Sequence, residues 1–149
     1  MEDEISRESR DLGRALCIIT GASKGFGRTL AFQLSCLLKP RSVLMLVART
    51  SEQLNQLKED IITLYGGQNE LDVRSSMSVF SSVCAAGPLD TDMQLQARRS
   101  SGDLQLRRSF SSMFSEGQLL SCEESGAKLM KLLLDDDFQS GAHLDFYEL

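Results

Sequence analysis

The chain has 149 residues, enough for one domain of ordinary size with a real hydrophobic core. Hydrophobic residues make up 42% of it and charged residues 25%, a globular rather than a disordered composition. The net charge of −5 argues against a general nucleic-acid-binding protein, which would carry a basic face. Its apolar runs are far shorter than the ~20 residues that cross a bilayer, and the charged residues 1–14 do not form a secretory signal. We therefore expect a soluble, cytoplasmic protein with neither a nucleic-acid nor a membrane partner.

The cysteines are scattered rather than paired. Cys17, Cys36, Cys84 and Cys122 form no Cys-x-x-Cys motif, and the sole histidine, His143, has no suitable neighbours. Structural zinc sites need four closely spaced ligands of this kind. We expect buried or half-buried free thiols and no metal site.

The first half of the chain alternates between short apolar runs and helical patterns. The predicted strands are 14–20, 42–48 and 69–73, and the predicted helices are 28–38 and 51–65. This alternation predicts an α/β fold with a parallel sheet and right-handed crossovers, the first half of a doubly wound sheet.

The second half of the chain is mostly helical in pattern. The polar segment 92–114 predicts a helix-loop-helix. Ser121 and Glu124 have the spacing of a capping box and open a helix through Leu134. The alternating residues 143–147 predict a terminal strand.

A glycine-rich turn joins the first predicted strand to the first predicted helix. Gly21 permits the tight turn, Gly25 lets the backbone approach a pyrophosphate, and Gly27 lets the helix pack closely on the strand. The helix N-terminus adds free N–H groups and a positive dipole for the anion. The turn therefore predicts a dinucleotide site, and the alternative is a structural turn without a ligand.

The end of the second predicted strand favours one cofactor. NAD enzymes usually place an acidic residue there to hold the ribose 2′-hydroxyl, but this strand ends Val47-Ala48-Arg49. Arg49 and Lys24 could together hold a 2′-phosphate, which favours NADP(H). Alternatively, both are solvated surface charges.

The Gly-x-x-x-Gly-x-Gly spacing resembles that of the short-chain dehydrogenase/reductase family, whose cofactors are NAD or NADP. Two further blocks, LGRALCIITGASKGFGRTLA with SVLMLVART and GPLDTDMQ with FQSGAHLDFYEL, resemble family members that reduce the side-chain carbonyls of pterins with NADPH. The resemblance implies a Rossmann-like doubly wound parallel sheet and a small-molecule pterin substrate.

The resemblance also implies site residues. The cofactor would contact the glycine loop, the end of the second strand, the third strand and the 87–94 segment: Gly21, Ala22, Ser23, Lys24, Gly25, Phe26, Gly27, Arg49, Thr50, Leu71, Asp72, Leu89, Asp90, Thr91, Asp92, Met93 and Gln94. Gly87 and Asp145 would contact the substrate, Asp145 by accepting charge-assisted hydrogen bonds from the pterin amino group. Alternatively, Asp145 caps a nearby loop, and Asp90 and Asp92 form turns.

The chain departs from this family at the catalytic residues. The family uses a Tyr with a Lys four residues later and an upstream Ser to protonate the developing alkoxide. Here Tyr65 is followed at that distance by Asn69, and no residue lies four positions after Tyr147. We therefore assign no catalytic residue and expect a chain that is inactive, or nearly so, by itself.

The residues between Asp72 and Gly87 are also too few for three strands with their crossovers. We expect a truncated sheet in which strands one to three and the terminal strand are kept and strands four to six are absent. The first strand then loses a neighbour, and such an apolar edge predicts aggregation.

These expectations divide the chain into four parts: a charged flexible leader at 1–13, an NADP-binding half at 14–73, a poorly defined bridge at 74–86, and a segment at 87–149 that closes over cofactor and substrate. Three functions stay open: a reductase of the family without its proton donor, a non-catalytic NADP-binding or interaction module, and an unstable product. A homo-oligomer or association with a full-length form is compatible with each.

Two basic stretches, at 98–101 and 107–109, resemble kinase substrates in their arginine–serine pattern. The candidate phosphorylation sites are Ser100, Ser101 and Ser109. The alternative is a solvated helix face.

Overall fold

The computed structural model describes residues 10–65, 72–76, 87–136 and 144–148. Its elements in chain order are β1 (Leu16–Thr20), α1 (Gly25–Ser35), β2 (Val43–Val47), α2 (Ser51–Tyr65), β3 (Asp72–Ser76), α3 (Asp92–Ser100), α4 (Leu104–Ser115), α5 (Cys122–Asp135) and the short 3₁₀ helix η1 (Phe146–Glu148). Among these described residues, no helix is long and apolar enough to cross a membrane.

The three strands form one parallel sheet in the order β1-β2-β3. Thr20 pairs with Val47 and Val47 with Ser76, so the carboxyl ends of all three strands meet at one edge. This arrangement confirms the predicted α/β fold. The shared edge is where ligands bind in open parallel sheets.

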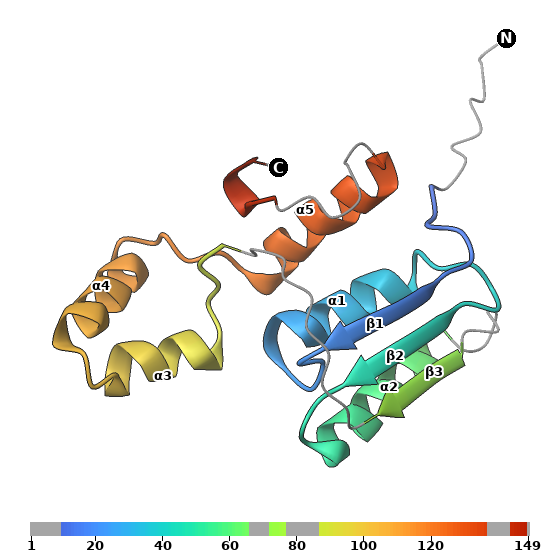
Figure 1. The fold of residues 1–149 in the computed structure, drawn as a ribbon, viewed down its shortest axis with the longest axis horizontal. Coiled ribbons are helices and arrows are strands. Elements are labelled where there is room, and N and C mark those ends of the chain that lie inside the picture. The colour runs from blue at the N-terminus through green and yellow to red at the C-terminus, as the bar shows by residue number, and fades with distance from the viewer. Residues whose placement is uncertain (1–9, 66–71, 77–86, 137–143, 149) are drawn as a thin grey trace, which may run out of the picture.

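Helices α1 and α2 cover one face of this sheet (Figure 1). Leu44 and Leu46 of β2 point into this layer and are fully buried, as are Leu57 and Ile61 of α2. The apolar residues of α2 recur at helical spacing, so the helix buries one face and exposes the opposite face to solvent. Burial of each such side chain stabilises the fold by roughly 1.5–3 kcal/mol.

The opposite face of the sheet is apolar and open at β1. Leu16 and Ile18 are 64% and 54% exposed, although both belong to a strand. Within the described residues β1 has a single strand neighbour, β2. On its other side, no described strand pairs with β1, and such an edge presents unpaired backbone groups.

The second half of the chain adds a helical hairpin and a docked helix. Helices α3 and α4 form the predicted helix-loop-helix and extend away from the sheet, whereas α5 packs along α1 (Figure 1). The predicted capping box opens α5, because Ser121 accepts a hydrogen bond from Glu124 N and the Glu124 side chain bonds Ser121 N. Gly126 lies directly against Gln33 of α1, where a Cβ atom would collide. Met130 of α5 thereby joins the core.

Several sequence predictions were wrong in detail. Strand β3 begins rather than ends near Asp72, since the polar residues after Val73 continue the ladder with β2. Of the predicted terminal strand, Phe146 and Tyr147 belong instead to the 3₁₀ helix η1. Cys36 is exposed, because it caps the end of α1 instead of joining its apolar stripe. Cys84, His143 and Leu71 lie outside the described residues.

Candidate functional site: a cavity between the glycine loop and residues 87–94

The glycine loop turns the chain from β1 into α1. Gly21 and Gly25 both have positive φ, at 63° and 58°, a conformation that side chains with a Cβ rarely adopt. A Cβ on Gly27 would lie 2.6 Å from the carbonyl oxygen of Gly21, so the third glycine is required for helix and strand to approach this closely. The amide of Ala22 donates to the carbonyl oxygen of Val47 at 3.2 Å and ties the loop to β2.

The first turn of α1 differs from those of α3, α4 and α5. Its N-cap residue, Lys24, gives no side-chain cap, and the turn contains no acidic residue. Side chains do cap α3, α4 and α5, through Thr91, Asp103 and Ser121. The N–H groups at the start of α1 therefore lack side-chain acceptors and can receive an anion.

Two cations stand at this end of the site. Lys24 and Arg49 are exposed, and neither forms an ion pair with any residue that the structure describes. Arg49 directly follows β2, on the same sheet edge as the glycine loop. An unpaired cation beside free helical N–H groups favours a polyanionic ligand.

The opposite wall is the segment from Gly87 into α3. Leu89 pairs with Leu120, Asp90 N donates to Leu120 O at 2.9 Å, and Leu120 N donates to Pro88 O at 2.8 Å. Thr91 then caps α3 by accepting from Gln94 N. The Thr91 methyl lies 3.7 Å from the position that a Cβ on Gly25 would occupy, so this wall lies close to the glycine loop.

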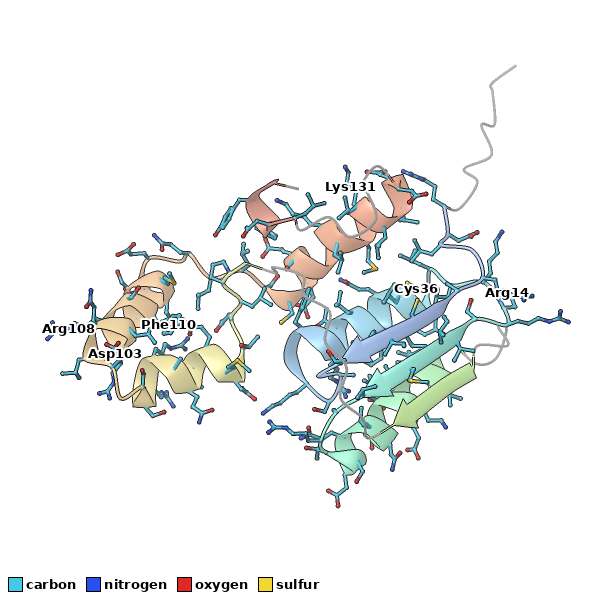
Figure 2. All side chains as sticks on the ribbon, in the orientation of Figure 1. Arg14, Cys36, Asp103, Arg108, Phe110 and Lys131 are labelled. Atoms are coloured by element: carbon cyan, nitrogen blue, oxygen red, sulfur yellow. The ribbon has the colours of Figure 1, made fainter. Side chains whose placement is uncertain are left out.

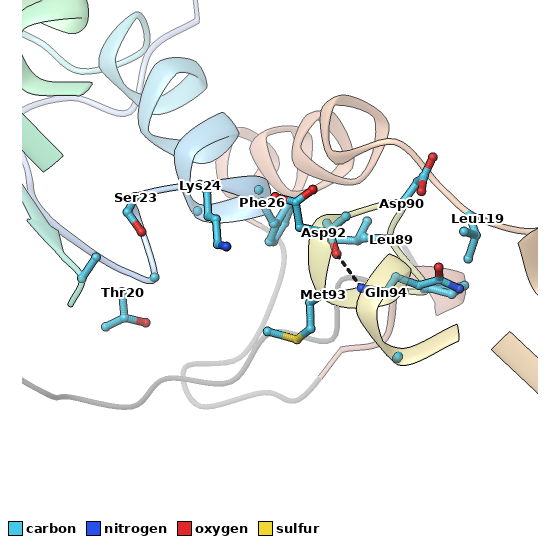
Figure 3. Close-up of a pocket in the computed structure, with 18 of the residues that line it drawn as sticks. Thr20, Ser23, Lys24, Phe26, Leu89, Asp90, Asp92, Met93, Gln94 and Leu119 are labelled. Atoms are coloured by element: carbon cyan, nitrogen blue, oxygen red, sulfur yellow. Dashed lines mark hydrogen bonds between the residues drawn. The ribbon is translucent and has the colours of Figure 1, made fainter. Parts of the chain in front are cut away.

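Between these walls lies a cavity of about 1350 Å³. Figure 3 shows Lys24 and Met93 on facing sides of it, with the Thr91–Gln94 hydrogen bond dashed. Its lining residues are Thr20, Gly21, Ser23, Lys24, Gly25, Phe26, Gly27, Val47, Ala48, Arg49, Thr50, Gln53, Gly87, Pro88, Leu89, Asp90, Thr91, Asp92, Met93, Gln94, Ala97, Phe110, Met113 and Leu119. The volume exceeds the ~300–1,000 Å³ of common small-molecule sites and leaves room for a dinucleotide.

An arginine holds the far end of the cavity together. Arg98 is only 13% exposed, stacks 3.7 Å from the ring centroid of Phe114, lies 3.7 Å from Asp90 and donates to Gln94 Oε1. Gln94 in turn donates to the carbonyl oxygen of Phe110 at 3.2 Å. These contacts fix α3 against α4 and place the ring of Phe110 on the cavity side of the hairpin, whereas Arg108 points outward (Figure 2).

The structure thus brings together most of the residues that the sequence singled out. From the glycine loop, the end of β2 and the 87–94 segment, every predicted residue except Ala22 lines the cavity. Ala22 is fully buried. Asp72 starts β3, at the opposite end of the sheet from the cavity, so its predicted place beside the cofactor does not fit this register. Asp145 lies outside the lining and accepts a hydrogen bond from Tyr147 N at 3.2 Å.

Sequence reasoning missed the apolar end of the cavity. Phe110 and Met113 lie three residues apart on α4, and with Ala97 and Leu119 they line its far wall. The three-residue spacing was a usable signal, since it places both side chains on one helix face. Gln53, in the first turn of α2 and four residues after Arg49, was also missed.

Three curated relatives of this chain carry the same name. Sepiapterin reductase from Rattus norvegicus is 27% identical over 261 positions, covering 95% of this chain and 100% of the rat protein. The protein of that name from Bos taurus is 27% identical over 256 positions, with coverages of 92% and 96%. The chain is therefore similar to sepiapterin reductases over nearly its whole length. In Xenopus tropicalis the match is 45% identical over 82 residues, covering 52% of this chain and 31% of that protein.

The alignment with the rat protein is longer than the chain itself. It runs over 261 positions, whereas the chain has 149 residues, so the rat protein contains a long stretch without a counterpart here. No family model matches the chain.

Solved structures match only partly. An L-sorbose reductase from Gluconobacter frateurii, complexed with NADPH and L-sorbose, is 20% identical with a TM-score of 0.38, covering 47% of this chain and 24% of that chain. An NADPH-dependent reductase involved in bacilysin biosynthesis is 19% identical with a TM-score of 0.34, covering 72% and 34%.

Proposed function

We propose that this chain binds NADPH in the cavity between the glycine loop and residues 87–94. The observation that carries the proposal is the convergence of two segments far apart in the sequence on one cavity. At one end lie Lys24 and Arg49, which form no ion pair with any described residue. The first turn of α1 would receive the pyrophosphate, and the two cations would hold the 2′-phosphate. The absence of a carboxylate after β2 removes the usual acceptor for an unphosphorylated ribose.

The relatives supply the reaction class. By similarity to sepiapterin reductase, the parent activity is the reduction of pterin side-chain carbonyls in tetrahydrobiopterin biosynthesis, with a hydride supplied by NADPH. The chain's own residues would bind and orient the nucleotide. Asn69, rather than a lysine, lies four residues after Tyr65, so Tyr65 lacks the partner that would help it protonate an alkoxide. We infer that the chain binds NADPH without turning over a pterin.

The alternative, a non-catalytic interaction module, is favoured by the open face and edge of β1. It would associate with a second copy or with a longer relative. Association without cofactor binding would favour this alternative.

The test is a calorimetric titration of the purified chain with NADPH and, in parallel, with NADH. We expect saturable binding of NADPH and at least about tenfold weaker binding of NADH, because charge-assisted contacts to a phosphate are the strong ones. Arg49→Gln should remove most of this preference, and Glu52→Gln, an exposed neighbour on α2, should not. Sepiapterin is then added while NADPH absorbance is followed.

Binding without consumption supports the proposal. Consumption of NADPH contradicts the inactivity of the chain. Equal affinity for NADPH and NADH contradicts the assignment of the two cations.

A further inference from the structure

The wall formed by residues 87–91 is braced from behind by an aromatic ring. Phe146 of η1 is 8% exposed. A Cβ on Gly87 would lie 2.8 Å from Leu120 Cδ1 and 3.3 Å from Phe146 Cβ and Cγ. Leu120 and Phe146 therefore leave no room for a side chain at Gly87, whose φ of 72° also favours glycine. Phe146 sets how far the start of this wall can retreat from the glycine loop.

Lys128 fixes this ring. Its Nζ lies 3.9 Å from the ring centroid of Phe146 and donates a hydrogen bond of 3.1 Å to the Phe146 carbonyl oxygen. The ammonium thus holds the aromatic face and the backbone of the same residue. A half-buried cation over an aromatic face is worth more than an exposed one, because less water competes for it.

The brace reaches the cavity through consecutive contacts. Lys128 belongs to α5, which is anchored on α1, and α1 begins at the glycine loop. Phe146 presses on Gly87, and Thr91, four residues later, meets Gly25. The two walls of the cavity are therefore connected in two places. Thr91 and Gly25 lie close together at the cavity, and on the side away from the cavity Lys128 connects Phe146 to α5.

We propose that Lys128 is a positioning residue, which acts through Phe146 to hold the 87–94 wall against the glycine loop. For its ligand this inference rests on the proposed function. Lys131 offers the contrast: it lies one turn nearer the end of α5, its side chain is 80% exposed, and it pairs with Asp135 at 3.1 Å (Figure 2).

The first test compares two ligands that share one end. In the proposed complex, NADPH contacts both walls of the cavity. Adenosine 2′,5′-bisphosphate contains only the phosphate-bearing adenosine, which would contact Lys24 and Arg49. We expect Lys128→Met to weaken NADPH about tenfold. The affinity for the bisphosphate should change by less than about twofold, because that end is distant from the brace. Lys128→Arg should restore most of the NADPH affinity, and the control Lys131→Met should alter neither ligand.

Three results overturn the inference. Equal weakening of both ligands by Lys128→Met indicates general destabilisation. Unchanged NADPH affinity shows that the brace does not reach the cavity. A Lys128→Arg variant as weak as Lys128→Met shows that the cation is not what holds the ring.

A second test needs no ligand and separates this inference from the proposed function. Backbone hydrogen exchange is measured at Asp90 and Leu120, whose amides hold the wall, and at Leu12, whose amide bonds Leu37 O at 2.8 Å as an internal reference. We expect Lys128→Met to speed exchange at Asp90 and Leu120 about tenfold and to leave Leu12 unchanged. Equal exchange in both proteins overturns the positioning role. If the wild type binds neither ligand, the proposed function fails, and the exchange result still decides the role of Lys128.

Discussion

A Cβ atom on Gly27 would lie 2.6 Å from the carbonyl oxygen of Gly21 and 3.0 Å from that of Thr20. Both obstacles are backbone atoms, so they cannot move aside as a flexible side chain would. The closeness of α1 to β1 therefore depends on a single missing methyl group. The same close approach sets the direction of the first turn of α1.

Gly27→Ala should destabilise the chain by about 1–3 kcal/mol, as overpacking does, and should weaken NADPH more than tenfold by displacing the first turn of α1. Chemical denaturation and calorimetry measure the two effects. Gly102→Ala is the matched control, because nothing lies within 4 Å of the added Cβ. If both variants bind NADPH like the wild type, the loop does not carry the nucleotide.

Arg98 should matter to stability far more than its neighbour Arg99. The Arg98 guanidinium lies over Phe114 and near Asp90, whereas Arg99 is exposed. Arg98→Met should lower the free energy of unfolding by about 1–2 kcal/mol, since it removes a cation–π contact and leaves Gln94 without its donor. Arg99→Met should change it by less than about 0.5 kcal/mol. Similar values for the two variants in urea unfolding would contradict the role of Arg98 in joining α3 to α4.

The three cysteines that the structure describes should react in an order set by burial. Burial raises the pKa of the Cys17 thiol, and burial with a smaller contribution from the Glu123 carboxylate raises that of Cys122. Cys36 is exposed. At neutral pH iodoacetamide should therefore alkylate Cys36 at least about tenfold faster than Cys17, because only the thiolate reacts.

Peptide mass spectrometry measures the alkylation rate of each cysteine. Raising the pH toward 9 should reduce the difference between the rates of Cys36 and Cys17. A Cys17 that reacts as fast as Cys36 at neutral pH would show that β1 opens readily.

The Asp60 carboxylate should contribute stability that acid removes. Its pKa is lowered by a hydrogen bond from Gln56 and by Arg28, whose guanidinium donates to it at 2.8 Å. A lowered pKa stabilises the folded state above the unfolded value of about 3.8 and ceases to do so as the pH falls through the folded value.

Asp60→Asn should therefore be less stable than the wild type at pH 7; the difference should begin to shrink near pH 3.8 and vanish once the pH is below the lowered folded-state pKa. Unfolding curves across this range measure the difference. Glu59→Gln, at an exposed neighbouring position, should follow the wild type throughout. A difference that persists unchanged at low pH would exclude the carboxylate as its cause.

Sequence patterns identified the elements whose physical signal is local. Helix α2 was predicted with the observed bounds because its apolar residues recur every three or four positions, and the α5 start because Ser121 and Glu124 bond each other. Strand β3 was placed too early, since Val73 is its only apolar member and the ladder with β2 defines the rest. Its pairing is non-local and leaves little trace in the sequence.

The residues of the candidate site also divide into those with a local sequence signal and those without one. The glycine loop and Arg49 follow from residue type and position, whereas the apolar end does not. Phe110 reaches the cavity only because Arg98 and Gln94 fold α4 back on α3. The terminal residues alternate like a strand, but Lys128 draws Phe146 onto α5 and the backbone turns into a 3₁₀ helix. Such contacts depend on the assembled fold.

The packing of α5 against α1 also has a consequence for biogenesis. On the ribosome, α1 is made long before Gly126 and Met130 become available to cover it, and until then one flank of the helix has no partner. In the folded chain, β1 has no second strand neighbour among the described residues. Holding chaperones should therefore bind the nascent chain. The yield of folded protein in cells should depend on how quickly α5 packs on α1.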